Sequence, residues 1–160
     1  MSNETSRPKE TIGYHYNPGK TVFLVSIDLK NKPGALASVT SILSNAGVNT
    51  LSGFTAVGAE KGIWGFFAET EKDMRAARLK ELIDGSPYVT NSMVVEGTGG
   101  LVVDNIHFPL RLSSGESMIL ARKEIFGDMF NRLREMFGSG GGAIVYEEGM
   151  ASGQSDANRL

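Results

Sequence analysis

The sequence predicts an α+β protein in which a four-stranded antiparallel sheet carries two helices on one face. Three observations support this fold class. Strand and helix patterns follow one another in the order βαββαβ between residues 21 and 97. A Pro-Gly pair opens the first helical pattern, and a glycine follows the end of each helical pattern. A short polar turn joins the second strand to the third, as in an antiparallel hairpin.

The first three elements are expected at residues 21–29 (strand), 33–46 (helix) and 48–59 (strand). Pro33 suits the first turn of the helix because its φ is fixed and it has no N–H group. One face of this helix is apolar, formed at helical spacing by Leu36, Val39, Leu43 and Ala46. Gly47 follows the last of these residues, where a left-handed helix cap is common.

The domain is completed by elements expected at residues 61–71 (strand), 73–84 (helix) and 89–96 (strand). The turn at residues 60–62 joins the second strand to the third as a hairpin. The order βαββαβ is the ferredoxin-like arrangement. With both helices on one face of the sheet, the other face is expected to be free for a partner.

The rest of the chain is expected to form an arm, a linker and a hairpin-helix segment. Residues 1–20 are polar with little periodicity, which predicts a flexible arm. Residues 98–100 form the linker, and residues 101–160 follow as a β-hairpin with two helices. The hairpin pairs the run 101–112 with residues 117–121. A helix with an apolar face follows at 123–137, glycines break it at 138–142, and a second helix is expected from 143.

Composition excludes several classes of protein. The chain has 160 residues, a net charge of −2 and no cysteine. The charge gives no reason to expect a nucleic-acid partner. Without cysteine, disulfides, thiolate zinc sites and cysteine nucleophiles are excluded, and a reducing cytoplasm is the expected location. No apolar run is long enough to span a membrane, and no signal peptide opens the sequence.

The pattern Asn31-Lys32-Pro33-Gly34-Ala35-Leu36, followed after a helix by Gly47-Val48-Asn49, resembles the start of an ACT domain. The resemblance covers about residues 21–97. Thr50 stands where that family usually has a branched apolar residue. The resemblance implies a ferredoxin-like regulatory domain that senses an amino acid or serves as a dimer interface. It also implies a homodimer or larger assembly, paired side by side through sheet edges and helices.

The second half, at about residues 106–153, resembles the opening of the 4-vinyl reductase domain. The resemblance rests on Ile119-Leu120-Ala121-Arg122-Lys123, the amphipathic helix and glycine break after it, and Tyr146-Glu147-Glu148-Gly149 with Gly153. Members of that family are small-molecule-binding modules. The segment covers only the opening of that domain, so we expect it to pack on the first domain or on another subunit. Its Phe and Met stripe is either core or the lining of an apolar pocket.

The turn before the first helix is the best candidate for a ligand site. Unpaired N–H groups at a helix start can bind a carboxylate, and Gly34 has no side chain to block the approach. The expected ligand-binding residues are Asn31, Pro33, Gly34, Ala35, Leu36, Val48 and Asn49, the last of these near the turn or across a subunit boundary. The alternative is that Pro33 and Gly34 only shape the turn.

No catalytic, metal or cofactor site is expected. His15 and His107 are the only histidines and lie far apart in the sequence, which supports neither a zinc site nor a catalytic triad. For His107, a packed or edge histidine is a better interpretation than a catalytic one. The sequence therefore predicts a non-enzymatic regulatory protein that binds an amino-acid effector. The alternative is a structural assembly module without a ligand.

Overall fold

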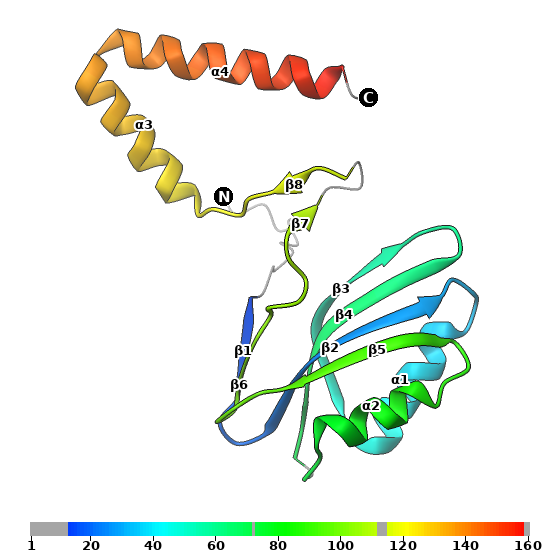
Figure 1. The fold of residues 1–160 in the computed structure, drawn as a ribbon. Helices are drawn as coiled ribbons and strands as arrows, with labels where there is room; N and C mark the ends of the chain where they lie inside the picture. Colours follow the sequence, from blue (N-terminus) through cyan, green and yellow to red (C-terminus); the bar gives the residue numbers. More distant parts are fainter. Residues whose placement is uncertain (1–12, 72, 112–114, 159–160) are drawn as a thin grey trace, which may run out of the picture. The chain divides into compact units, whose positions relative to one another are not determined.

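The computed structural model of the chain describes residues 13–71, 73–111 and 115–158 (Figure 1). The chain divides into two units, Met1–Phe108 and Pro109–Leu160. The predicted arm at residues 1–20 lies partly outside the described residues. Of the described part, Tyr14–Tyr16 form strand β1. The predicted linker at 98–100 lies inside the first unit, because the residues after it pair with β1 as strand β6 (Leu101–Val103).

The first unit contains the predicted ferredoxin-like fold. Its four-stranded sheet has the order β3-β4-β2-β5, and every neighbouring pair is antiparallel. Figure 1 shows both helices of this unit on one face of the sheet. The elements, in chain order, are β2 (Thr21–Lys30), α1 (Ala35–Ala46), β3 (Asn49–Val57), β4 (Lys61–Thr70), α2 (Ala76–Asp84) and β5 (Val89–Glu96). The α+β prediction is therefore confirmed, with both helices starting two or three residues later than expected.

The core lies between the sheet and the two helices. Alternate residues of β2 face the helices because successive side chains of a strand point to opposite faces. These residues are Phe23, Val25, Ile27 and Leu29, and all four are buried. Val39 and Leu43 of α1 and Leu79 and Ile83 of α2 belong to the same buried cluster.

The other face of the sheet is not wholly free, contrary to expectation. Val22, Leu24 and Phe67 of the sheet form a second buried cluster with Val102 of β6. The chain itself therefore covers part of this face after β5. Further along the same face the sheet stays open, and Ile63 is 43% exposed.

His107 and Gly65 explain how residues 101–107, which we call the covering segment, pack against the sheet. Asp104 holds the His107 ring through Nδ1, which lies 2.9 Å from Asp104 Oδ2. The ring packs edge-on against Phe54, and both rings occupy the space above Gly65. A Cβ atom at position 65 would stand 2.5 Å from the Phe54 ring and 2.8 Å from the His107 ring. His107 is therefore a packed histidine, as expected.

The second unit is a small hairpin followed by two helices. The hairpin pairs β7 (Leu110–Arg111) with β8 (Ser117–Met118), so it is shorter than predicted because residues 101–103 belong to the first unit. Helix α3 (Lys123–Phe137) agrees with the prediction. The next helix, α4 (Ser139–Ala157), begins inside the glycine run rather than after it. One residue, Gly138 with φ 57°, suffices for the break.

Candidate functional site

A cleft of about 320 Å³ lies between the start of α1 and the hairpin that joins β3 to β4. We call it the α1 cleft. A volume near 300 Å³ is at the lower end of the range for small-molecule sites in proteins and suits a ligand of amino-acid size. The cleft is lined by Leu29, Lys30, Asn31, Lys32, Pro33, Gly34, Ala35, Leu36, Ala37, Thr55, Val57, Gly62, Ile63 and Trp64.

Asn31 ties the turn before α1 to the hairpin. Its backbone N–H donates to the carbonyl of Glu60 at 2.8 Å. Its side-chain Nδ2 donates to the carbonyl of Gly58 at 2.9 Å and to that of Ala59 at 3.3 Å. Because these bonds occupy the amide nitrogen, Asn31 offers a ligand only its side-chain oxygen. The main structural role of Asn31 is to connect the turn before α1 to the β3–β4 hairpin, which form two walls of the cleft.

Gly34 makes the helix start accessible. It is the N-cap of α1 and has φ 86°, a backbone conformation that glycine adopts without strain. This conformation also explains why Pro33 precedes the helix instead of lying in its first turn. Gly34 provides no side-chain cap, and the first turn contains no acidic residue. The first N–H of α1, that of Ala35, donates to the Lys32 carbonyl at 3.2 Å. The N–H groups of Leu36 and Ala37, which follow in the first turn, have no intrahelical partner and are the ones available to an acceptor in the cleft.

Helix α2 provides an internal comparison. Its first N–H, that of Ala76, donates to Glu96 Oε2 at 3.0 Å, and Arg75 binds the other oxygen of the same carboxylate at 3.0 Å. A carboxylate from the neighbouring strand thus occupies the positive end of α2. Helix α1 has no such side-chain cap, and its first N–H donates to a backbone carbonyl, so a carboxylate from outside the chain can approach only the next N–H groups of its first turn.

One side of the α1 cleft is positively charged and the other side is apolar. Lys30 and Lys32 lie beside the turn, and no acidic residue lines the cleft. Lys30 Nζ donates to the carbonyl of Pro87 at 2.7 Å, which fixes that charge at the rim. Opposite them, Trp64 of β4 provides an apolar wall on the helix side of the sheet. The arrangement suits a ligand with one anionic end and one apolar end.

The structure brings five of the seven predicted residues together. Asn31, Pro33, Gly34, Ala35 and Leu36 all line the α1 cleft, although the Ala35 side chain is buried. The other two, Val48 and Asn49, lie at the opposite end of α1. A helix of 12 residues is about 18 Å long, so one ligand of amino-acid size cannot touch both ends within one chain.

Val48 and Asn49 belong to a second hollow of about 440 Å³, which we call the Asn49 hollow. It is lined by Thr40, Leu43, Ser44, Gly47, Val48, Asn49 and Thr50. The Val48 side chain is only 5% exposed and packs in the core. The side chain of Asn49 hydrogen-bonds to Glu69.

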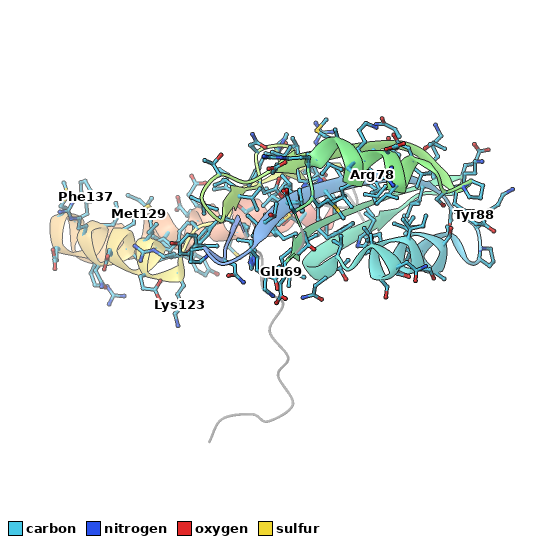
Figure 2. All side chains as sticks on the ribbon, turned by 90° about the horizontal axis from the view of Figure 1, so that it is seen from below. Glu69, Arg78, Tyr88, Lys123, Met129 and Phe137 are labelled. Atoms are coloured by element: carbon cyan, nitrogen blue, oxygen red, sulfur yellow. The ribbon has the colours of Figure 1, made fainter. Side chains whose placement is uncertain are left out.

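Glu69 is a buried carboxylate that the sequence analysis missed (Figure 2). Lys20 Nζ donates to its Oε1 at 2.7 Å, while Asn17 Nδ2 at 3.0 Å and His15 Nε2 at 3.3 Å contact its Oε2. The hydrogen bond from Lys20 lowers the pKa of Glu69 from 4.5 to about 2, although burial acts in the opposite direction. Bonds from Asn17, His15 and Asn49 lower it further. Glu69 therefore anchors the residues around β1 to the sheet.

Among residues 13–71, 73–111 and 115–158, no three His, Cys, Asp or Glu side chains lie close enough together to hold a metal ion. Nor does any helix of those ranges combine the length and apolar content needed to cross a membrane.

No protein-family model matches the chain, and no curated protein does. Among solved structures, it is similar to the C-terminal domain of the MgtC protein from Mycobacterium tuberculosis, with 15% identity and a TM-score of 0.41 over 51% of this chain and 92% of that one. It is also similar to the ligand-free regulatory subunit of aspartate kinase from Thermus thermophilus, with 15% identity and a TM-score of 0.39. That match covers 52% of this chain and 55% of the aspartate kinase subunit. No functional assignment rests on these two likenesses.

Proposed function

We propose that the chain is a non-enzymatic regulatory protein whose first unit binds an amino acid in the α1 cleft. The observation that carries the proposal is the start of α1, which has no side-chain cap and opens into a cleft of about 320 Å³. The resemblance of residues 31–36 and 47–49 to an ACT domain supports the same function.

The carboxylate of the amino acid accepts hydrogen bonds from the N–H groups at the start of α1. Such bonds to an ionised group contribute roughly 1.5–3 kcal/mol each. The positive end of the helix and the charges of Lys30 and Lys32 favour the same orientation. Since no acidic side chain lines the cleft, the ammonium group is bound by neutral acceptors such as Asn31 Oδ1 and the Thr55 hydroxyl. The site therefore recognises the carboxylate more strongly than the amine.

The side chain of the amino acid lies toward the apolar wall. Trp64 is partly exposed on that wall and stacks on Phe66, with ring centroids 4.2 Å apart, which holds its indole in place. A fixed aromatic surface gives contact area at a small cost in side-chain entropy. Apolar and aromatic amino acids are accordingly the preferred ligands.

A homodimer is part of the proposal for the first unit. Strand β3 is an edge strand of the sheet, and its second half is exposed. An exposed edge presents unpaired backbone groups that can pair with another chain. Such pairing offers a way to bring the Asn49 hollow of one copy toward the α1 cleft of another.

A thermal-shift screen of the whole chain against the twenty amino acids tests the function. A ligand that binds only the native state stabilises it by about 2.7 kcal/mol at 100 times its Kd. We expect a rise in melting temperature with one or more apolar or aromatic amino acids. The carboxamide of the same amino acid, which lacks the carboxylate, is the control and should produce no shift. A melting temperature that stays constant with all twenty contradicts the proposal.

A further inference from the structure

Helix α3 exposes a continuous apolar stripe that the first-unit function does not use. None of its side chains is buried, and Leu133 alone is partly buried. Taken at 100° per residue, the apolar positions fall within one arc of the helix. They are Ile125, Phe126, Met129, Phe130, Leu133, Met136 and Phe137.

Helix α4 does not cover this stripe. The two helices diverge from the turn at Gly138 (Figure 1). Their close approach is near that turn, where a Cβ atom on Gly141 would stand 2.5 Å from the Leu133 carbonyl oxygen. Gly141 is the one buried residue of α4. Ile144, Tyr146 and Met150 of α4 are themselves exposed.

The size of the stripe fits an interface between proteins. Six of the seven large side chains are between 42% and 73% exposed, Leu133 is less so, and together they present roughly 600 Å² of apolar surface. Soluble monomers rarely expose contiguous apolar patches above a few hundred Å². About 800 Å² per partner is buried in a stable interface of standard size. The α3 stripe with its polar flanks reaches that range.

The charges beside the stripe indicate what covers it. Glu124 and Asp128 lie in the first half of α3, and Arg132 and Arg134 lie in the second. Asp128 and Arg132, four residues apart, flank the same side of the stripe. When two copies of α3 pack antiparallel about residue 130, Asp128 of each copy meets Arg132 of the other. Lys123 and Glu135 carry the opposite charge within each half, so the net charges of the two halves remain −1 and +1.

We propose that α3 is a self-association surface, on which α3 of a second copy packs in antiparallel orientation about Phe130. The second copy is the occupant because the stripe, the two flanking charges and the helix dipoles are all complementary to themselves under a two-fold axis. This contact is independent of any pairing through the sheet edge of the first unit.

Single-cysteine variants of the whole chain test the orientation, since the natural sequence contains no cysteine. At 1.5 Å per residue, the two copies of residue 129 are offset by about 3 Å along the axis and those of residue 136 by about 18 Å. A disulfide requires Cα atoms within about 7 Å. Met129→Cys should therefore form a cross-linked dimer on mild oxidation. Met136→Cys should form about tenfold less cross-linked dimer, because its two copies lie too far apart along the helix axis for a disulfide.

Cross-linking through random collisions of monomers would be more efficient for Met136→Cys than for Met129→Cys, because Met136 is 73% exposed and Met129 only 45%. Comparable cross-linking of both variants would indicate parallel helices and overturn the orientation. A failure of Met129→Cys to cross-link would overturn the surface itself.

Reversing the charge of Asp128 or of Arg132 in the Met129→Cys variant provides a second test, which addresses the pairing of these two residues between copies. Asp128→Arg places two arginines on the flank of each copy, and Arg132→Asp places two aspartates there. Each variant alone should associate about tenfold more weakly than the parent, because two attractive pairs become repulsive. An equimolar mixture should recover the parent yield through opposite-charge pairs. Weak cross-linking that persists in the mixture would overturn the proposed pairing.

Discussion

Gly65→Val is expected to destabilise the first unit by about 3 kcal/mol, near the upper end for an overpacked core site. The branched side chain would enter space that the Phe54 and His107 rings already occupy. His107 cannot move freely, because Asp104 binds its Nδ1 and accepts from its backbone N–H at 3.0 Å. The covering segment would therefore leave the sheet or be displaced on it. A fall of about 12 °C in the melting temperature of the first unit is the expected measurement.

Gly62→Val is the matched control, on the same strand of the same sheet. A Cβ atom at Gly62 would be 3.3 Å from the carbonyl oxygen of Ala56 and in ordinary contact with the Val57 side chain. Its cost should be no more than about 1 kcal/mol. Equal losses in the two variants would show that residues 104–108 do not depend on Gly65 for their place on the sheet.

Glu69→Gln is expected to be the second most damaging change, costing on the order of 3 kcal/mol at neutral pH. The variant removes the charge that Lys20, Asn17 and His15 surround, and it leaves Lys20 without its closest partner. Chemical denaturation at pH 7, compared with wild type, measures the loss. Glu71→Gln is the control, because the Glu71 carboxylate is 83% exposed and lies 3.9 Å from Lys20. It should change stability by less than about 0.5 kcal/mol.

The pH dependence follows from the lowered pKa of Glu69. A carboxylate whose pKa falls on folding stabilises the native state at pH values above its unfolded pKa of 4.5. This contribution is lost as the pH falls from 4.5 toward the folded value of about 2. Wild type should therefore lose more stability than Glu69→Gln across that window. Parallel stability curves for the two proteins would contradict the role of Glu69 as a charged anchor.

The sequence predicted the first unit well because its signals are local. The Pro-Gly pair, the glycine after α1 and the turn at residues 60–62 each act within a few residues. The covering segment could not be predicted in the same way. Strands β1 and β6 are three residues long, too short for a periodic pattern, and their pairing joins residues 14–16 to residues 101–103. The space above Gly65 depends on two rings that come together only in the folded chain.

In the candidate site, too, the local features were predicted from the sequence and the features that depend on the folded chain were missed. The turn at residues 31–36 was predicted because one short stretch forms it. Its apolar wall was missed, because Trp64 reaches the cleft through the register of β4 in the sheet. The separation of Asn49 from this turn follows from the length of α1 alone and was within reach of the sequence. Glu69 also left a signal, as a charged residue directly after the aromatic run of β4.

The central claim is that the α1 cleft binds the ligand, and calorimetry on two matched glycine variants tests it most directly. Gly34 and Gly47 cap opposite ends of α1 with φ of 86° and 73°. Valine at either position imposes a similar backbone strain of about 1–2 kcal/mol. Position 34 lines the α1 cleft, where a Cβ atom meets only the Tyr88 hydroxyl at 3.9 Å, whereas position 47 lines the Asn49 hollow.

The titrations use an amino acid that raises the melting temperature of the wild type. We expect Gly34→Val to weaken its binding at least tenfold, a loss of about 1.4 kcal/mol. Gly47→Val should bind it with the wild-type affinity despite a comparable loss of stability. Undiminished binding by Gly34→Val, or loss of binding in Gly47→Val alone, would contradict the claim and place the ligand outside the α1 cleft.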